Sequence, residues 1–354
     1  MSIPTITLSG PADLLAAIPH MLGFQPESSL VTVSMQAGPQ GSRVGLVTRV
    51  DLPTAADAVE AAESLLPALI RESPSALMVV GYGTITEDVA EAVDMASTVL
   101  IGNDLPVRDR VVVADGRWLS LDCSDHECCP EDGSPLPGSD AAVGLEFAWA
   151  FGSAPAPSRD AVVERVTAGS RAAAVGRECD RQTNCEGEVT IERGVSVWGL
   201  LLDPRTPVRL SALSDGTLAL AGLSLHADGG VVLRDTLIAW LCPGTIPLEA
   251  IAGPTLDGLR KVLPLPWRVE EVSDAEQVNA ARLYVLDRLV EVAACLPDEH
   301  ASPALTLLAQ VAWSQGSGVL ASVALERALT AVPNYRLAQM MHRLISLGMP
   351  CPRD

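Results

Sequence analysis

The densest group of residues that could do chemistry is the segment Cys123-Ser124-Asp125-His126-Glu127-Cys128-Cys129-Pro130. Thiolate and imidazole groups bind zinc tetrahedrally, and a short loop can bring them together without regular secondary structure. Cys123, His126, Cys128 and Cys129 therefore form a candidate structural zinc site, and zinc is the cofactor that this chain would hold. The spacing differs from a pair of C-x2-C knuckles, and adjacent cysteine side chains tend to diverge. A disulfide and a rigid loop of packed or free thiols are the alternatives.

A second group of charged residues is scattered through the first 51 positions: Asp13, Glu27, Arg49 and Asp51. Asp13 lies in the first turn of an expected helix, where compensation of the helix dipole explains it without catalysis. Arg49 and Asp51 share one face of an expected strand, because strand side chains alternate, so they form a surface pair or line a cleft. These four residues are the candidate catalytic groups if the protein is an enzyme.

Standard catalytic and nucleotide-binding motifs are absent from the sequence. No G-x-G-x-x-G follows an expected strand, and there is no G-x-x-x-x-G-K-[ST] phosphate loop. A G-x-S-x-G nucleophile elbow and an H-E-x-x-H zinc helix are also missing. The sequence therefore names no cofactor beyond the possible zinc ion.

Composition limits the class of protein. The chain has 354 residues, of which 48% are hydrophobic and 19% charged, so it can form a sizeable core and is not disordered. Its net charge of −20 repels phosphate backbones, so we expect no nucleic-acid partner. The start of the chain lacks a basic region before a long apolar run, and no stretch is apolar enough to cross a membrane. Eight cysteines are too few for a disulfide scaffold, so a cytoplasmic protein without membrane contact is expected.

The first part of the chain, residues 1–121, is predicted to be an α/β domain with a mixed sheet. A helix should run from Pro11 to the glycine at 23, and Asp115-Gly116 between two apolar runs is typical of a type I′ hairpin. The expected strands are 3–8, 29–35, 44–52, 76–81, 111–114 and 117–121, and helices are expected from about 53 to 72 and from 86 onward.

The rest of the chain is predicted to be helical after a cysteine-rich loop over residues 122–140. We expect a helical domain at 141–264 and a C-terminal helical bundle at 265–354, which gives an all-α second half. Small and apolar residues before the proline at 333 have the spacing of a tetratricopeptide-type helical hairpin, with its turn at residues 316–318. One such hairpin must stack on neighbouring helices, because it cannot bury its own face.

Several blocks of the chain together resemble one known family. Residues 11–24 (PADLLAAIPHMLGF) and 26–31 (PESSLV) resemble the opening signature of the domain-of-unknown-function family 4192. Residues 49–53, the cysteine segment, and the stretch from Ala312-Trp313 to Leu329 are similar to later blocks of that family. Ser317 stands where an acidic residue is expected after Gly316. The resemblance implies an actinobacterial or actinophage origin and a shared architecture, but it implies no reaction.

Three functions remain open at this point. The first is a non-enzymatic protein-binding or regulatory protein that uses the C-terminal bundle as a docking surface, for a protein partner or for a second copy of the chain. The lack of a convergent catalytic set favours it. The second is a hydrolase-type enzyme with its site in the N-terminal α/β domain. The third is a phage virion or assembly protein. A deep polar cavity in the N-terminal half, with ionisable groups around it, would argue against the first function.

Overall fold

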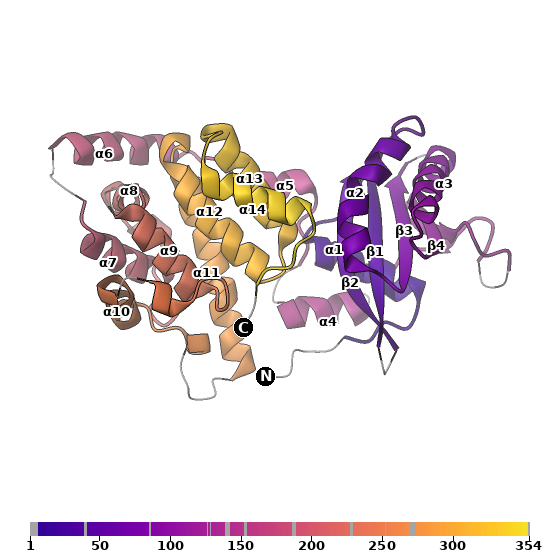
Figure 1. Ribbon diagram of the computed structural model, residues 1–354, viewed down its shortest axis with the longest axis horizontal. Coiled ribbons are helices and arrows are strands. Elements are labelled where there is room, and N and C mark those ends of the chain that lie inside the picture. Colours follow the sequence, from indigo (N-terminus) through magenta and orange to yellow (C-terminus); the bar gives the residue numbers. More distant parts are fainter. Residues whose placement is uncertain are drawn as a thin grey trace. The chain divides into compact units, whose positions relative to one another are not determined.

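The computed structural model divides the chain into two compact units, each described here by itself (Figure 1). The α/β unit comprises Ile3–Arg159 with Ser346–Met349, and the helical unit comprises Asp160–Ile345 with the residues at both ends of the chain. The structure describes residues 6–38, 41–84, 86–125, 127, 129–138, 142–151, 154–185, 189–226, 229–251, 253–268 and 274–352.

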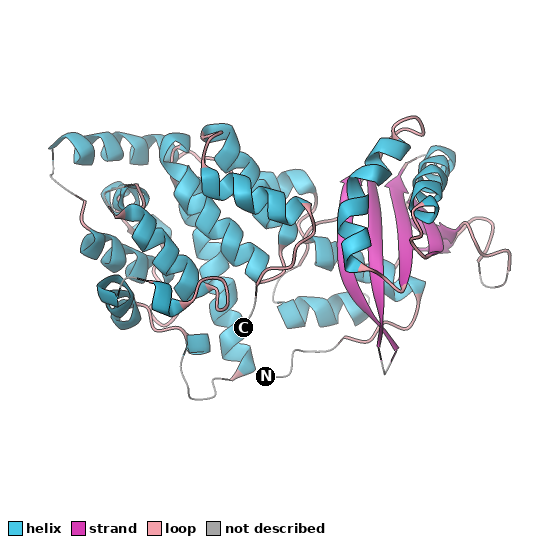
Figure 2. Cartoon of the chain, viewed as in Figure 1, coloured by secondary structure: helices cyan, strands magenta, loops and turns pink. Residues whose placement is uncertain are grey.

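A six-stranded mixed sheet forms the centre of the α/β unit (Figure 2). Its elements are α1 (Pro11–Leu22), β1 (Ser29–Gly38), β2 (Gly41–Asp51), α2 (Ala58–Glu72), β3 (Ala76–Gly83), α3 (Thr86–Gly102), β4 (Val107–Ala114), β5 (Arg117–Ser120), β6 (Ser134–Pro135) and α4 (Ala142–Phe151). The strand order is β2-β1-β3-β4-β5-β6, in which β3 and β4 run parallel and the other neighbours run antiparallel. The predicted mixed sheet is confirmed.

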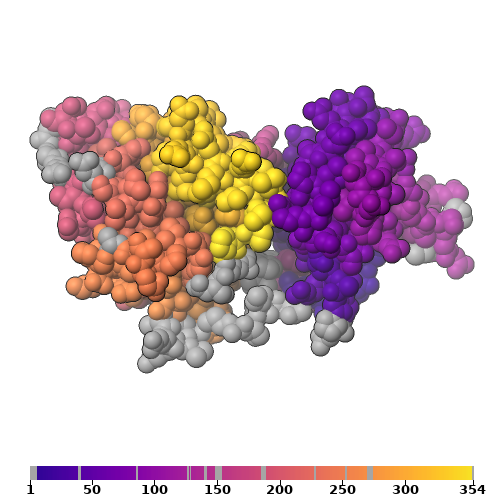
Figure 3. Space-filling view, in the orientation of Figure 1, coloured from indigo at the N-terminus to yellow at the C-terminus, as the bar shows by residue number. Residues whose placement is uncertain are grey.

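Helices α2 and α3 cover one face of this sheet, and in the orientation of Figure 3 their side chains lie in front of it. Leu30, Leu77, Val79 and Val112 point toward these helices and form the core with them. Gly81 lies on the same face, where an added Cβ would come within 2.5 Å of a methyl group of Val89. Strand side chains alternate, so the residues between these, including Tyr82, belong to the opposite face.

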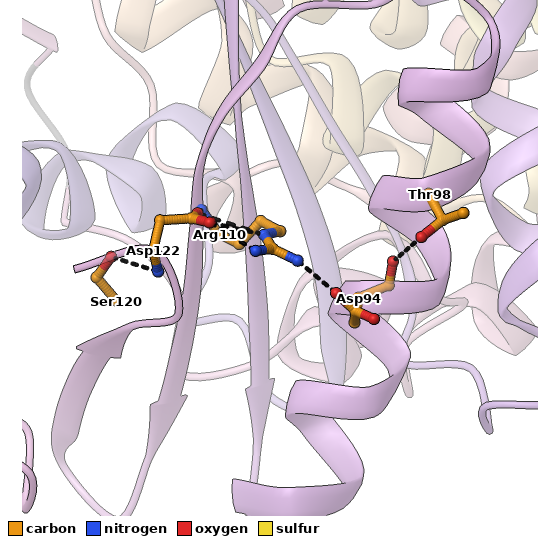
Figure 4. Close-up of polar contacts among 5 residues, drawn as sticks. All are labelled: Asp94, Thr98, Arg110, Ser120 and Asp122. Carbon is orange, nitrogen blue, oxygen red and sulfur yellow. Dashed lines mark hydrogen bonds and ion pairs between the residues drawn. The ribbon is translucent and has the colours of Figure 1, made fainter. Parts of the chain in front are cut away.

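An arginine on β4 ties α3 to the sheet (Figure 4). The Arg110 side chain forms an ion pair with Asp94 on α3 and donates from Nε to Asp122, 3.0 Å away. The backbone N–H of Arg110 also donates to Asp122 at 2.8 Å. These hydrogen bonds from Arg110 hold the pKa of Asp122 below its usual range. The cluster therefore anchors the end of β5 and the middle of α3 to the start of β4.

The helical unit is built from ten α-helices among the residues that the structure describes. They are α5 (Arg159–Val166), α6 (Ala172–Cys185), α7 (Ile191–Leu202), α8 (Asp215–Ser224), α9 (Gly230–Leu241), α10 (Gly253–Val262), α11 (Ala275–Cys295), α12 (Asp298–Ser314), α13 (Gly318–Ala331) and α14 (Arg336–Ser346). Three short 3-10 turns lie between them at Leu210–Ala212, Leu248–Ala250 and Pro266–Arg268. None of the described helices is long and apolar enough to span a bilayer.

Helices α12 and α13 form the predicted hairpin. Gly316, in the turn, has a φ of +86°, a conformation that glycine adopts without steric cost. Ser302 of α12 donates to the carbonyl of Ala328 on α13 at 3.1 Å. Arg327 then fastens the hairpin to the preceding helix by donating to the carbonyls of Ala293 and Leu296, each at 2.8 Å. The all-α second half with a tetratricopeptide-like hairpin is thus confirmed.

Some expected elements differ from the structure. The strand expected at residues 3–8 is not formed in its described part, because Ile6 and Leu8 pack on a small cluster between α1 and α4 instead of pairing with the sheet. The stretch from residue 159 to 175, which is helical in its apolar period, is split into α5 and α6. Between them, the N–H of Gly169 donates to the carbonyl of Ala294 at 2.8 Å, so the chain leaves the helical path there.

The two units of the structure are divided differently from the four segments expected from the sequence. The division falls after residue 159, so the cysteine-rich segment and α4 belong to the α/β unit. Residues 160–345 form one compact unit, whereas we expected separate parts at 141–264 and 265–354.

A candidate ligand-binding cleft in the α/β unit

A cleft of about 490 Å³ lies where the parallel strands β3 and β4 end. Its walls are the C-terminal half of α1, the loop from residue 25 to 28, the ends of β3 and β4, the β4–β5 turn and residues 136–138. Ligands in α/β folds bind outside the carboxyl ends of strands, where neighbouring connections leave the sheet in different directions. Here β3 has the parallel strand β4 on one side and the antiparallel strand β1 on the other, so the cleft occupies such a place. Its volume is in the usual range for small-molecule sites.

Tyr82 is the buried polar residue of this cleft. It lies near the end of β3, on the sheet face opposite α2 and α3, and is only 5% exposed. Its hydroxyl is buried and has no hydrogen-bond partner within the described part of the chain. Burial raises the pKa of Tyr82, so the hydroxyl stays protonated and can donate a hydrogen bond. Buried hydroxyl groups normally have partners, so an unpaired one on a residue that lines a cleft is unusual.

His20, in the last turn of α1, is the titratable ring of the cleft wall. It is half-buried, and its ring centre lies 5.6 Å from that of Phe147 on α4. Burial lowers the pKa of His20, so the ring is neutral at pH 7. A neutral imidazole has one N–H donor and one acceptor nitrogen, so His20 can meet either kind of polar ligand group.

The loop that carries Glu27 is held by backbone hydrogen bonds on both sides. The N–H of Gln25 donates to Ala156 at 2.8 Å, and the N–H of Leu52 donates to Ser28 at 2.8 Å. Ser28 has a φ of +39°, in the left-handed region that residues other than glycine rarely adopt. Such strained conformations persist only where the surroundings impose them, and they concentrate at binding sites. The loop is therefore a fixed lip of the cleft, with Glu27 exposed on it.

The four candidate catalytic residues do not all meet at one place. Glu27 lines the cleft, and Arg49 lies behind its loop, where Arg49 Nε donates to the Ser29 hydroxyl at 2.8 Å. The Ser29 hydroxyl in turn donates to the carbonyl of Glu27 at 2.6 Å. Asp51 pairs with Arg49 at 2.6 Å, so the predicted same-face pair exists and supports the loop rather than lining the cleft. Asp13 is elsewhere, where its carboxylate accepts the N–H of Ser9 at 2.8 Å, as a helix N-terminus requires.

The candidate zinc site is described only in part. His126 and Cys128 lie outside the described residues, whereas Cys123 and Cys129 are both half-buried. In the described part of the chain, no group of three or more histidine, cysteine, aspartate or glutamate residues is arranged to hold a metal ion. The segment after the cysteines has a clear structural role, because the N–H of Leu136 donates to the carbonyl of Gly116 at 2.8 Å. This bond helps to place residues 136–138 at the wall of the cleft.

A second hollow, of about 560 Å³, lies on the helical unit between α6 and the start of α8 and is wide open. Three of its four charged lining residues, Glu178, Arg181 and Asp215, have ion-pair partners. Arg181 pairs with Glu178, and Asp215 at its rim accepts from Arg171 at 2.7 Å. The hollow also contains a buried acceptor without a partner in the described structure, Gln182 Oε1, but its openness to solvent makes it a weaker enclosure for a small molecule than the cleft of the α/β unit.

Sequence reasoning identified Glu27 but not Tyr82 or His20. Tyr82 directly follows an apolar run that was assigned to a buried strand, and a polar tip at the end of such a strand is the signal that was available. His20 is one of five histidines in the sequence, and no base or nucleophile lies near it in the chain to single it out. Its place in the wall depends on the packing of α1 against α4, which no local pattern encodes.

Fold and site together define a protein with an α/β unit that carries a strand-end cleft and a separate all-helical unit. The chain belongs to the family described as Domain of unknown function (DUF4192), whose model matches residues 11–207 and 270–351. The family suggested by the sequence blocks is thus confirmed. No curated protein and no solved structure matches the chain.

Proposed function

We propose that the α/β unit binds a small organic molecule in the cleft at the ends of β3 and β4. The observation that carries the proposal is the buried Tyr82 hydroxyl, which lacks a partner in the wall of that cleft. Leaving a buried donor unpaired costs about 1–3 kcal/mol, and a ligand acceptor would recover this free energy. The strained loop at Ser28 and the two ionisable groups His20 and Glu27 give the site further polar contacts.

Binding is favoured over hydrolysis by the state of the possible nucleophiles. Ser29, next to the strained residue, is fully buried, and its hydroxyl is occupied by Arg49 and by the Glu27 carbonyl. Within the described residues, no hydrogen bond links His20 to a serine, threonine or cysteine. Covalent hydrolysis relies on a nucleophile that is hydrogen-bonded to a base, so we propose binding rather than hydrolysis for this cleft.

The docking function expected for the C-terminal bundle has weaker support. The large exposed apolar residues of the described helical unit are Leu200, Val231, Val232 and Met340. They are distributed over α7, α9 and α14, and three of the four lie outside the C-terminal bundle at 265–354. Docking surfaces are usually contiguous apolar patches, so these residues do not favour protein docking over ligand binding.

A fragment screen on the full chain tests the proposal. Thr84 is exposed and lines the cleft, so Thr84→Trp would fill part of the space, while Thr98→Trp places the same bulk on an exposed site of α3. Ligand-observed NMR should find fragments that bind the wild type and the Thr98→Trp variant but not Thr84→Trp. If every fragment that binds the wild type also binds Thr84→Trp with equal affinity, the cleft is not the binding site.

A further inference from the structure

The charged residues of the cleft are all acidic. Glu27 lies on the loop before β1 and Asp115 lies in the β4–β5 turn, so two separate walls each contribute one exposed carboxylate. No lysine or arginine is among the described residues that line the cleft, and burial lowers the pKa of His20, which favours its neutral form. The cleft therefore presents about two negative charges to an incoming ligand, on a chain whose net charge is −20.

Two arginines beside lining residues, Arg49 and Arg117, have partners of their own in the chain. Arg49 pairs with Asp51 at 2.6 Å and donates to Ser29, and its side chain is only 15% exposed. Arg117 donates from Nε to the carbonyl of Asp132 at 2.6 Å, in the segment that leads to β6. A phosphate or carboxylate ligand would thus meet two carboxylates without a guanidinium partner. Like charges at short range disfavour binding, so the cleft selects against anions.

The inner wall of the cleft selects a different ligand group from the one that the acidic walls select. The Tyr82 hydroxyl is a donor without a partner, so the ligand atom beside it must be a hydrogen-bond acceptor such as a carbonyl or hydroxyl oxygen. At the lip, Glu27 and Asp115 are acceptors, so they favour a donor with positive charge. The two ends of the cleft therefore select different groups of the same molecule.

We infer that the cleft binds a small cationic molecule with a protonated amine toward Glu27 and Asp115 and an oxygen acceptor toward Tyr82. This inference rests on the proposed function, since it names the ligand class of the same cleft. The amine accounts for the two acidic walls, and the acceptor accounts for the orphan hydroxyl. Neither feature alone would define the ligand, but together they fix both its charge and its polarity.

Matched sets of fragments test the ligand class on the full-length protein. Each set shares one amide and differs at the other end, as in 4-aminobutanamide, butanamide and succinamate, which end in an ammonium, a methyl and a carboxylate group. Dissociation constants are measured by NMR titration for every set in which at least one member binds the wild type but not Thr84→Trp. We expect the ammonium member to bind most tightly in these sets, and its advantage to shrink as salt is added, because salt screens exposed charges.

Charge-neutral variants then identify the acidic groups responsible. Glu27→Gln and Asp115→Asn should each weaken the binding of the ammonium member roughly 1.5- to 5-fold, which is the range of a solvent-exposed ion pair. The affinity for the neutral member should stay unchanged. Asparagine also suits the left-handed conformation of residue 115 in the type I′ turn, so the turn is preserved. Glu91→Gln, on the exposed surface of α3, is the matched control and should change neither.

Two outcomes would overturn different parts of the argument. If carboxylate members bind in the cleft as tightly as ammonium members, or if both acid-neutralising variants leave the preference intact, the inferred ligand class is wrong while the cleft remains a binding site. If Thr84→Trp weakens the binding of no fragment of any charge, the proposed function is wrong. The inferred ligand class is then wrong as well.

Discussion

Removing the orphan hydroxyl of Tyr82 should make the ligand-free protein more stable. In Tyr82→Phe the ring keeps its packing and only the oxygen is lost. That oxygen is buried without a partner in the described structure, so it contributes desolvation without a compensating hydrogen bond. An unpaired buried polar group costs about 1–3 kcal/mol, and the small void left by the oxygen offsets part of the gain. We expect the free energy of unfolding to rise by about 1 kcal/mol.

The chain offers matched controls, because its other two tyrosines have hydrogen-bond partners. Arg234 donates to the Tyr335 hydroxyl at 2.6 Å, and the Tyr284 hydroxyl donates to the carbonyl of Leu201 at 3.4 Å. Tyr335→Phe should lower the free energy of unfolding by about 1.5 kcal/mol, because hydrogen bonds to charged groups are the stronger ones. The Tyr284 hydroxyl also accepts from Arg288 Nη2 at 3.4 Å, so Tyr284→Phe breaks two long bonds and should cost about 1 kcal/mol.

Hydrogen exchange measured by mass spectrometry can follow each unit separately. Peptides from β1 and β3 report the opening of the α/β unit, and peptides from α9 and α14 report that of the helical unit. Slower exchange in β1 and β3 of Tyr82→Phe, with weaker binding of amide fragments, is the expected pair of results. A Tyr82→Phe variant destabilised as much as Tyr335→Phe would refute the reasoning, because the hydroxyl would then have a partner already.

Three further substitutions test the fold. Arg110→Met removes the contacts with Asp94 and Asp122 and should lower the free energy of unfolding by about 1–2 kcal/mol, since these groups are partly exposed and screened. Gly81→Ala places a methyl group against α3 and should cost about 1–3 kcal/mol by overpacking. Hydrogen bonds, chiefly from the side chain of Arg205, lower the pKa of Asp203. The ionised carboxylate therefore stabilises the fold above the unfolded aspartate pKa of about 4, and this stabilisation is lost as pH falls through the lower folded-state pKa. Asp203→Asn should make the stability of the protein depend less on pH in the acid range.

Each of these substitutions has its own measurement and control. Urea denaturation of Arg110→Met is compared with Arg165→Met, whose exposed pair with Asp287 at 3.0 Å should contribute less than 1 kcal/mol. Equal losses for the two variants would contradict the role of Arg110. Hydrogen exchange of β3 peptides checks Gly81→Ala, and unchanged exchange would show that α3 moves away freely. Thermal unfolding between pH 2 and pH 7, a range of about five pH units around the aspartate pKa, checks Asp203→Asn, and an acid limb identical to that of the wild type would contradict the pKa argument.

Much of the fold could be predicted because its signals are local. Asp115-Gly116 forms the expected tight turn, with φ values of +50° and +71°, since type I′ geometry demands residues that tolerate the left-handed region. Helix α1 ends at Gly23 in the left-handed conformation, as its sequence indicates. The apolar run at the start of β3 became a strand buried on both faces, which is the environment that such runs favour.

The errors arose where tertiary contacts overrode a local pattern. Residues 6–8 alternate like a strand, yet Ile6 and Leu8 pack against α1 and α4. The cleft could not be predicted for the same reason, because Tyr82 and His20 are 62 positions apart and meet only through the packing of α1 near the sheet edge. Glu27 stood out in the sequence because it is a carboxylate, but the strained Ser28 beside it has no signature in its residue type.

The way this chain uses arginine helps to explain its acidic surface. Arg327 donates to the carbonyls of Ala293, near the end of α11, and Leu296, just beyond it, and Arg171 donates from Nη1 to the carbonyl of Leu210 at 2.7 Å. Arg117 holds the β6 segment in the same manner. A guanidinium group has five donors in a rigid fork, so it can satisfy several carbonyls where loops meet helices, which an ammonium group does less well. Guanidinium groups bound to the chain's own backbone are less available to external anions, and acidic residues outnumber basic ones 44 to 24, which gives the net charge of −20. An acidic cleft on such a protein attracts cations from a distance and orients them at the lip, so the electrostatic field of the whole chain and the local chemistry of Glu27 and Asp115 favour the same class of ligand.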